Sequence, residues 1–377
     1  MSTHLPSSKF QSEVQSLVNW TVPTADSSSI DTGLVAWNKI KVMLDESTTA
    51  SSVFTNAVVS TYSLVYTAAS AYIGGILNFS GDINLIPFSA NRGQKINSSG
   101  VVSTYSLVYT TTSAYVGGVL ASNGDIHFVP YSANRGQKVN SSGVVSTYSL
   151  VYTALSAYLG GVLATNGEVH FIPGSANRGQ KISNAGVVST YSLVYTTSNA
   201  YAGGVLAPNG DIHFIPFLAT VGQKISSAGV VSTYSLVYTR SNAYTGSVLA
   251  NNGDIHFVPS AAAVGQKINT SGTVSTYSLV YTNTSGAYQG GVLAPNGDIH
   301  FIPYTATVGQ KINSSGVVST YSLLYTLTST GAYFGGILTS TGDIHFIPLS
   351  AANGQKISTL CGFDFKNVAL SSFFNKL

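Results

Sequence analysis

Residues 101–143 read VVSTYSLVYTTTSAYVGGVLASNGDIHFVPYSANRGQKVNSSG, and close copies of this unit fill most of the chain. The copies start 43 residues apart five times and then 44 residues apart. A period near 43 residues with four strand-like runs per copy is typical of a β-propeller blade. The sequence therefore predicts an all-β fold, a seven-bladed β-propeller of four-stranded antiparallel blades. The string VVSTYS, or TVSTYS in one copy, marks the units at Val58, Val101, Val144, Val187, Val230, Thr273 and Val317.

Within one unit, β-branched and aromatic runs separated by turn residues predict the strands. The pair Asn123-Gly124 predicts a two-residue type I′ hairpin turn, in which both positions have positive φ. Pro130 ends the strand that follows this turn. The strands expected in this copy are Thr104 to Tyr109, Ala114 to Ala121, Asp125 to Val129 and Gln137 to Asn140.

Paired glycines predict which strand lies innermost. The strands nearest a propeller axis crowd together, and glycine allows the closest backbone approach. We therefore name the glycine strand A, the Asp-Ile-His-Phe strand B, the Gly-Gln-Lys-Ile strand C, and the Ser-Thr-Tyr-Ser strand D, the outermost. The glycine positions are Gly74-Gly75, Gly117-Gly118, Gly160-Gly161, Gly203-Gly204, Gly290-Gly291 and Gly335-Gly336, with Gly246-Ser247 as the departure.

The ends of the array predict how the ring closes. The array begins with a D strand, Val58 to Tyr66, and ends with a C strand, Gln355 to Ser358. Pairing of these two strands would complete the last blade and remove an exposed edge. We expect the N-terminal D strand to close the ring in this way.

Composition excludes several classes of protein. Only 8% of the 377 residues are charged and the net charge is +3, without basic runs, so we expect no nucleic-acid partner. No apolar run approaches the ~18 residues of a membrane span. Cys361 is the single cysteine, which excludes an intrachain disulfide. The N-terminus shows no signal-peptide pattern.

Non-repeated segments flank the array. Residues 1–57 are predicted to dock on a partner or to cap the ring, and residues 58–358 form the propeller. The apolar tail, residues 359–377, is predicted to pack on the propeller or on a partner. The ring itself is expected to be oligomeric within a larger assembly.

Differences between the copies gather in the loops that join strand B to C and strand D to the next A. These loops emerge on one face of the ring and carry the four arginines of the chain. We interpret this face as a contact surface for an acidic or glycan partner. The alternative is that these loops vary freely because they contribute little to the core. The candidate contact residues are Arg92, Arg135, Arg178 and Arg240.

Histidine, acid and lysine each recur at a fixed position of the repeat. Six histidines on separate B strands are too far apart to share a metal ion, so we expect each to pack against the adjacent blade with one ring nitrogen hydrogen-bonded. A mild pH sensitivity of blade packing is then expected. The acid after the hairpin turn and the lysine of strand C predict a repeated ion pair or turn cap. Tyrosines such as Tyr105 and Tyr115 are expected to fill the space between blades, with an aromatic glycan platform as the alternative.

No catalytic motif is present: the sequence has no G-x-S-x-G, H-E-x-x-H or P-loop pattern. Each repeat supplies one acid, whereas glycoside hydrolysis needs a carboxylate pair. An active site also needs unlike residues at one place, which a symmetric repeat does not provide. We therefore expect a protein that is not an enzyme, with no catalytic residue, no cofactor and no metal site.

The string GGVLAPNGDIHFIP, at Gly203 to Pro216 and again at Gly290 to Pro303, resembles a family of tandem propeller repeats found in microbial and tailed-phage proteins. The resemblance covers the array and the Phe-Phe-Asn-Lys ending, but not residues 1–57. It implies a propeller associated with virus particles and transfers no catalytic or binding residue. The Trp-Asp and Gly-His motifs of WD40 and kelch repeats are missing.

These observations predict a structural or adhesion component of a phage particle, assembled in the host cytoplasm. Its expected partners are other virion structural proteins and host surface glycans. One alternative is a multivalent carbohydrate-binding lectin with a shallow sugar site on each blade. The other is a cytoplasmic protein-interaction scaffold.

Overall fold

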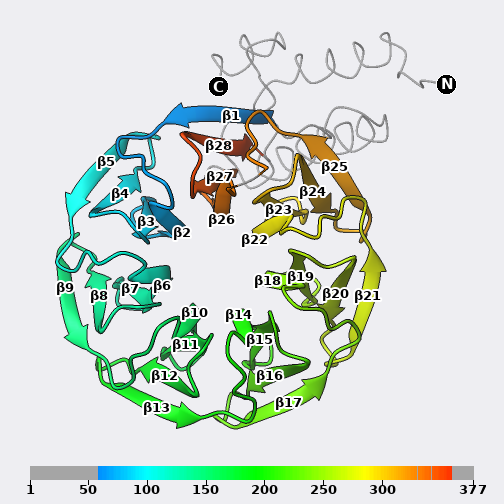
Figure 1. Ribbon diagram of the computed structural model, residues 1–377, viewed down its shortest axis with the longest axis horizontal. Coiled ribbons are helices and arrows are strands. Elements are labelled where there is room, and N and C mark those ends of the chain that lie inside the picture. The colour runs from blue at the N-terminus through cyan, green and yellow to red at the C-terminus, as the bar shows by residue number, and fades with distance from the viewer. Residues whose placement is uncertain (1–57, 329, 341, 359–377) are drawn as a thin grey trace, which may run out of the picture. The chain divides into compact units, whose positions relative to one another are not determined.

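The computed structural model describes residues 58–328, 330–340 and 342–358. Within these ranges the chain is built from strands joined by short turns and loops, and it forms seven four-stranded antiparallel sheets arranged as blades around an axis (Figure 1). The predicted seven-bladed β-propeller is thus confirmed. The segments 1–57 and 359–377, for which docking, capping and packing roles are predicted, lie outside the described residues.

The strands keep the same place in each blade, so they can be given by position. The A strands, which lie nearest the axis, are β2 (Tyr72–Leu77), β6 (Tyr115–Leu120), β10 (Tyr158–Leu163), β14 (Tyr201–Leu206), β18 (Tyr244–Leu249), β22 (Tyr288–Leu293) and β26 (Tyr333–Leu338). The B strands are β3 (Ile83–Pro87), β7 (Ile126–Pro130), β11 (Val169–Pro173), β15 (Ile212–Pro216), β19 (Ile255–Pro259), β23 (Ile299–Pro303) and β27 (Asp343–Pro348).

The C and D strands complete each blade toward the rim. The C strands are β4 (Arg92–Ile96), β8 (Arg135–Val139), β12 (Arg178–Ile182), β16 (Val221–Ile225), β20 (Val264–Ile268), β24 (Val308–Ile312) and β28 (Asn353–Ser358). The D strands are β5 (Val102–Ser106), β9 (Val145–Ser149), β13 (Val188–Ser192), β17 (Val231–Ser235), β21 (Val274–Ser278), β25 (Val318–Ser322) and β1 (Val58–Ser63). Figure 1 shows the D strands following the outer rim of the ring.

The ring closes by the predicted pairing of its two ends. Strand β1 pairs antiparallel with β28 in a register that runs from Val58 opposite Ser358 to Ser63 opposite Asn353. The seventh blade therefore has the order β1-β28-β27-β26, with its outer strand taken from the start of the array. This pairing covers the edge of β28 that would otherwise expose unpaired backbone groups.

The predicted type I′ turn is wrong. Gly124 has positive φ (85°), but Asn123 is absent from the residues with positive φ. The N–H of Gly124 donates to the carbonyl of Ala121 at 2.9 Å, which closes a four-residue turn one position earlier than expected. This is the pattern of a type I turn followed by glycine in the left-handed region. Because Asn123 accepts the N–H of Asp125 through its side chain, it is used as a turn cap.

Adjacent A strands approach each other closely at their glycines. A Cβ placed on Gly160 would lie 2.9 Å from the Cα of Gly203, and one on Gly290 would lie 2.8 Å from the Cα of Gly335. Any side chain at these positions would push neighbouring blades apart. The paired glycines thus set the inner circumference, as the sequence predicted.

The hydrophobic core lies between and within the blades. In each blade a tyrosine from strand A is fully buried, and most blades add a buried phenylalanine from strand B, such as Tyr115 and Phe128. Their rings meet edge to face at 5.4 Å between centroids. This confirms that strand A tyrosines fill core space. Within the described residues, the structure contains no helix long and apolar enough to span a membrane.

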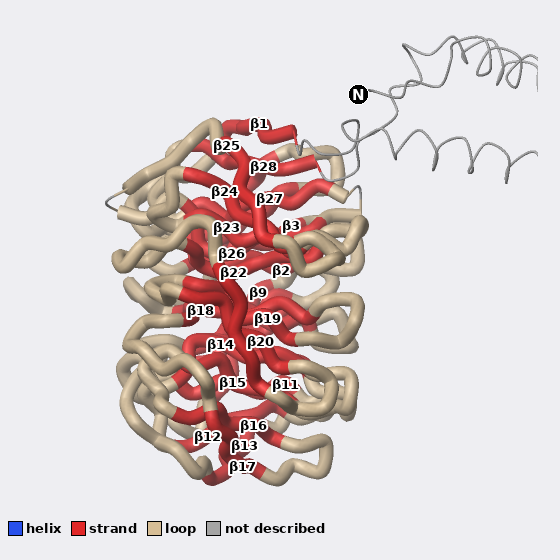
Figure 2. The backbone as a smooth tube through the Cα atoms, turned by 90° about the vertical axis from the view of Figure 1, so that its right-hand side faces the viewer, coloured by secondary structure: helices blue, strands red, loops and turns tan. Residues whose placement is uncertain are grey.

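Because successive strands of a blade run in opposite directions, their connections emerge on two opposite faces of the ring. We call the face formed by the B–C and D–A connections the loop face, and the face formed by the A–B and C–D turns the turn face. Figure 2 shows the strands of the ring edge-on, with loops projecting to both sides. The candidate contact arginines lie on the loop face, and the repeated acids, lysines and histidines lie toward the turn face.

Candidate functional site

The predicted contact residues all lie on the loop face. Arg92, Arg135 and Arg178 occupy the first position of strand C in three consecutive blades, and their side chains are exposed. Arg240 lies in the connection that leads to β18, where its Nη1 donates to the carbonyl of Ala261 at 3.0 Å. The structure brings the first three into one arc and leaves Arg240 apart from it.

Two of these arginines stack on tyrosines of the preceding D–A connection. The guanidinium carbon of Arg92 lies 5.5 Å from the ring centroid of Tyr66, and that of Arg178 lies 5.5 Å from the centroid of Tyr152. Such cation–π contacts orient a guanidinium without neutralising it. The arc therefore presents oriented, unpaired positive charge on the loop face.

The loop face carries cations without carboxylates among the described residues. The seven acids of the array follow the A–B hairpins on the turn face, and each pairs with the strand C lysine of its own blade. Their charges cancel there. The four arginines are left as the net charge of the array, concentrated on the opposite face.

A second feature of the loop face escaped the sequence reasoning. The residue after the strand A tyrosine differs in every blade, although the strands are otherwise nearly constant. A position-by-position comparison of the repeats would have found it. The seven residues are Ile73, Val116, Leu159, Ala202, Thr245, Gln289 and Phe334. The residue after the strand B proline varies as well: Phe88, Tyr131, Gly174, Phe217, Ser260, Tyr304 and Leu349.

These two variable positions make the inner edge of the loop face asymmetric. Over several neighbouring blades they form one apolar cluster, with Phe88 against Tyr131 at 5.8 Å between centroids and Tyr304 against Phe334 at 6.4 Å. In the fifth blade the same positions hold the polar residues Thr245 and Ser260. A nearly symmetric ring thus has an uneven inner edge on its loop face.

The turn face carries the repeated histidines. In five blades the histidine Nδ1 lies 3.2–3.5 Å from the hydroxyl of the strand D tyrosine of the same blade, as His127 does with Tyr148. The predicted hydrogen bond of the imidazole is confirmed in these five blades, but its partner lies inside the same blade and not in the adjacent one. In the seventh blade His345 Nδ1 is buried without a hydrogen-bond partner among the described residues. Burial lowers the pKa of His127 to about 4, and the nearby Lys138 acts in the same direction.

The predicted acid–lysine pair is present in every blade. Lys138 Nζ lies 2.6 Å from Asp125, and Lys311 Nζ lies 2.7 Å from Asp298. Register places histidine and lysine side by side on strands B and C, as with His127 opposite Lys138. No group of three or more histidine, cysteine, aspartate or glutamate residues in the described ranges is arranged to hold a metal ion.

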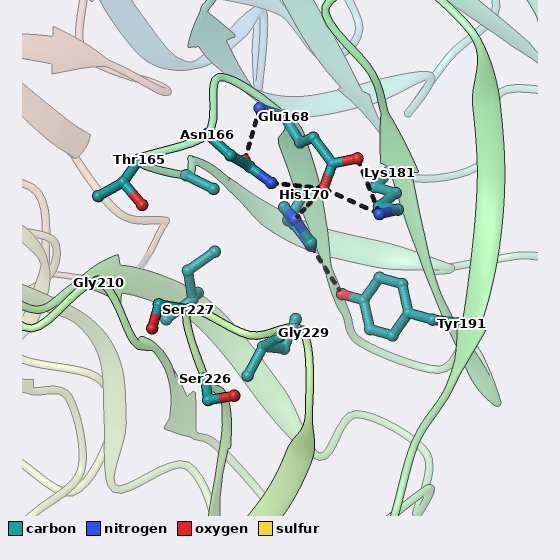
Figure 3. Close-up of a pocket in the computed structure, with 13 residues that line it drawn as sticks. Thr165, Asn166, Glu168, His170, Lys181, Tyr191, Gly210, Ser226, Ser227 and Gly229 are labelled. Carbon is teal, nitrogen blue, oxygen red and sulfur yellow. Dashed lines mark hydrogen bonds and ion pairs between the residues drawn. The ribbon is translucent and has the colours of Figure 1, made fainter.

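One polar hollow of about 80 Å³ lies on the turn face between the third and fourth blades (Figure 3). The third blade contributes Glu168, His170 and Lys181, and the fourth contributes Ser226 and Ser227. The sequence analysis identified the acid, the histidine and the lysine as repeat positions, but it noted neither serine and did not predict a hollow here. The difference arises from side-chain size at two turn positions, which is visible only once neighbouring blades are placed.

Comparisons with known proteins define the fold. No family model matches the chain, and no curated protein sequence matches it. A streptogramin B lyase structure is similar with a TM-score of 0.71 and 21% identity, over 81% of this chain and 99% of the lyase. Virginiamycin B lyase from Staphylococcus aureus gives 0.71 and 18%, over 80% and 99%. An extracellular domain of a two-component system from B. thetaiotaomicron gives 0.62 and 10%, over 81% and 42%.

These similarities correct one expectation. The prediction that the chain is not an enzyme rested on the idea that a ring of repeats leaves no room for catalysis. Similar rings include lyases, and a histidine-to-alanine variant of the S. aureus enzyme is catalytically inactive. The repeat architecture therefore does not exclude catalysis. At these identities the similarity establishes the propeller fold and transfers no site residue.

Proposed function

We propose that this propeller is a contact platform that binds an acidic partner through its loop face. The observation that carries the proposal is where the blades differ. The strand B–C–D framework and the turn-face ion pairs are repeated almost unchanged, whereas the loop face varies in its arginines and along its inner edge. Variation among these exposed loop-face positions supports a role for that face in recognition.

Charge specifies the kind of partner. The turn-face acids and lysines neutralise each other within each blade, so the four loop-face arginines determine the field of the array. Arg92 and Arg178 are oriented by Tyr66 and Tyr152, and the Nε of Arg178 also donates to Oδ1 of Asn177 at 3.4 Å. A guanidinium fork matches carboxylate, sulfate or phosphate groups well. The proposed partner is accordingly an acidic protein surface or an anionic glycan.

A binding assay with defined anionic glycans tests this proposal. The full chain is passed over immobilised sulfated and sialylated glycans, with neutral glycans as the reference. The triple variant Arg92→Gln/Arg135→Gln/Arg178→Gln should lose binding, and the triple lysine variant should retain part of it. Asp254→Glu, on the turn face of the fifth blade and outside the hollow beside Glu168, should leave it unchanged. Anionic-glycan binding that survives the triple glutamine variant would show that this face is not used; no binding leaves an acidic protein as the partner class.

Binding to an acidic protein is tested by a separate experiment. Crosslinking of the full chain within its native assembly, followed by identification of crosslinked peptides, locates the contacts. The proposal expects crosslinks from the B–C and D–A connections. Crosslinks confined to the turn face or to the D strands would overturn it.

The location of the platform is a separate proposal. The resemblance of the repeats to those of tailed-phage proteins supports a place on a virus particle, beside other virion proteins and facing host glycans. Mass spectrometry of purified particles tests it. Absence of the chain from particles would refute this location and leave the loop-face proposal standing.

A further inference from the structure

The space between the third and fourth blades is lined by a different acidic residue from the one found in the other blades. Six blades have aspartate after the hairpin turn, whereas the third has Glu168. The side chain of Glu168 is 20% exposed, compared with 9–17% for the six aspartates. The extra methylene therefore brings this carboxylate further toward solvent. The aspartates are Asp82, Asp125, Asp211, Asp254, Asp298 and Asp343.

The carboxylate of Glu168 is held in place from three sides. Lys181 Nζ lies 2.8 Å from Oε1 and 2.9 Å from Oε2. Asn166 Nδ2 donates to Oε2 at 3.0 Å, and His170 Nε2 lies 3.6 Å from Oε2. Figure 3 shows these groups converging on one side of the hollow. A carboxylate fixed in this way offers its remaining lone pairs in defined directions.

The opposite wall is made of small residues. At the first position of the C–D turn four blades have asparagine, the third has Ser183 and the fourth has Ser226, which Ser227 follows. Ser226 Oγ accepts the N–H of Val230 at 3.1 Å, so its hydroxyl proton is free to be donated. Gly229 adds no side chain. The hollow thus has a carboxylate–ammonium wall and a hydroxyl wall (Figure 3).

The charged groups that line the hollow favour neither anions nor cations as ligands. Glu168 and Lys181 form a pair with no net charge, and burial lowers the pKa of His170 to about 4, which leaves it neutral at pH 7. An anion would be repelled by the carboxylate and a cation by the ammonium. A ligand that both donates and accepts hydrogen bonds without charge matches this wall best. Adjacent hydroxyl groups have that property.

The size of the hollow fits this chemistry. A volume of about 80 Å³ exceeds the ~10–15 Å³ that one water needs, so several waters fit beside these polar groups. Hydroxyl groups of a ligand can replace such waters and keep their hydrogen bonds. Ala164, Ile212 and Ile225 supply an apolar part of the lining, on which the C–H face of a sugar ring can rest.

We propose that the hollow between the third and fourth blades binds a neutral polyhydroxylated ligand, either a free monosaccharide or one sugar unit of a glycan, with Glu168, Lys181 and Ser226 as its polar contacts. The site lies on the turn face and is independent of the proposed loop-face function.

Saturation-transfer NMR on the full chain tests the proposal. The probes are glucose, galactose, mannose and N-acetylglucosamine, each as the free sugar and as its methyl glycoside. At least one sugar should receive saturation and show millimolar affinity. Binding of the methyl glycoside with equal affinity indicates a glycan unit, and loss of binding on methylation indicates a free monosaccharide.

Two variants use residues that other blades already have at the same positions, which keeps them compatible with the fold. Glu168→Asp withdraws the carboxylate and Ser226→Asn fills the opposite wall. Each should weaken binding about tenfold, the effect expected for loss of one hydrogen bond to a charged group. The matched control Asp254→Glu, in the fifth blade, should leave the affinity unchanged.

Three results would overturn the proposal. The first is the absence of saturation transfer to every sugar. The second is equal affinity in wild type and in both variants, which would place the sugar elsewhere. The third is preferential binding of acetate or phosphate at Lys181, which would show an anion site. None of these results depends on the loop-face arginines, so this test and that of the platform fail separately.

Discussion

Tyr66 donates its backbone N–H to Oε1 of Gln94 at 2.8 Å, and this bond links the last blade of the ring to the first. Tyr66 follows β1, which belongs to the seventh blade, whereas Gln94 lies fully buried at the centre of β4 in the first blade. The same oxygen accepts the N–H of Val65 at 3.2 Å. Every blade repeats this arrangement, as Gln137 does with Val108 and Tyr109. One buried amide per blade therefore fastens the outer connection of its neighbour.

Removal of this acceptor should destabilise the ring. In Gln94→Met the side chain keeps its approximate length but leaves two backbone N–H groups without an acceptor. Each unsatisfied buried donor costs about 1–3 kcal/mol, so we expect the two together to lower the free energy of unfolding by about 2–6 kcal/mol. Urea unfolding followed by circular dichroism measures it.

The matched variant Gln137→Met distinguishes the contribution of this bond to overall stability from its contribution to ring closure. It removes the same two contacts between blades that are consecutive in the chain, so it should cost a similar free energy without loosening β1. Hydrogen exchange of residues 58–63 should rise in Gln94→Met alone. Equal exchange in both variants would show that Gln94 has no special part in closure.

Closure also depends on a glycine against an aromatic ring. A Cβ on Gly354 would lie 2.2 Å from the ring of Tyr62, so alanine at this position must displace the ring. Tyr62 belongs to β1, which pairs with β28 alone. Gly354→Ala should therefore cost about 1–3 kcal/mol by overpacking and release β1 locally. Limited proteolysis near residue 63 reports that release.

Gly309→Ala is the control for this prediction. It creates the same clash with Tyr321, 2.1 Å from the added Cβ, in a blade whose four strands follow each other in the chain. We expect similar loss of stability but no new cleavage at β25. If neither variant lowers the unfolding midpoint, the rings are free to move aside and glycine is not required here.

Much of this architecture could be predicted because the same local sequence pattern occurs seven times in the chain. Paired glycines such as Gly160-Gly161 predicted the innermost strands, and the leftover D strand at Val58 predicted closure. The turn at Asn123 could not be predicted as reliably, since several hairpin types accept Asn-Gly and tertiary register decides among them. The hollow beside Glu168 depends on Ser226 from the next blade, 58 residues away in the chain. Contacts between neighbouring repeats are not encoded by the pattern within one.

Asn84 occupies the histidine position in the first blade. We predict that asparagine in place of histidine lowers the stability of that blade. The Nδ2 of Asn84 and the hydroxyl of Tyr105 are buried without a hydrogen-bond partner among the described residues. In five of the other blades a longer imidazole reaches this hydroxyl, as His127 reaches Tyr148 at 3.2 Å. Asn84→His should restore that bond and raise the free energy of unfolding by about 1 kcal/mol.

The reverse exchange is the control, and both are measured by guanidinium unfolding at pH 7.5. His127→Asn should lose a comparable free energy by separating Tyr148 from its partner. A destabilising effect of Asn84→His would mean that the first blade has repacked around the smaller amide and has no room for an imidazole.

Buried histidines should make the ring sensitive to acid. Burial, reinforced by the strand C lysine, lowers the pKa of His127, His213, His256, His300 and His345 from 6.5 to about 4. In His170 burial is again the main cause and Glu168 opposes it, also with a pKa of about 4. Each folded pKa lies below the unfolded one. Between pH 6.5 and pH 4 the unfolded chain thus binds more protons, and stability falls as the pH falls.

With six such groups the free energy of unfolding should decrease by up to about 8 kcal/mol per pH unit in that window, and it should be insensitive to these histidines above pH 7. We expect cooperative acid unfolding between pH 6.5 and pH 4, measured by tyrosine fluorescence and by urea midpoints at half-unit steps. His127→Asn removes one titrating group, so its slope should be smaller by about 1.4 kcal/mol per pH unit even though its stability at pH 7.5 is lower. A wild-type protein equally stable at pH 7.5 and pH 5 would show that the imidazoles accept protons inside the folded ring, and the tight His127–Tyr148 packing would then not hold in solution.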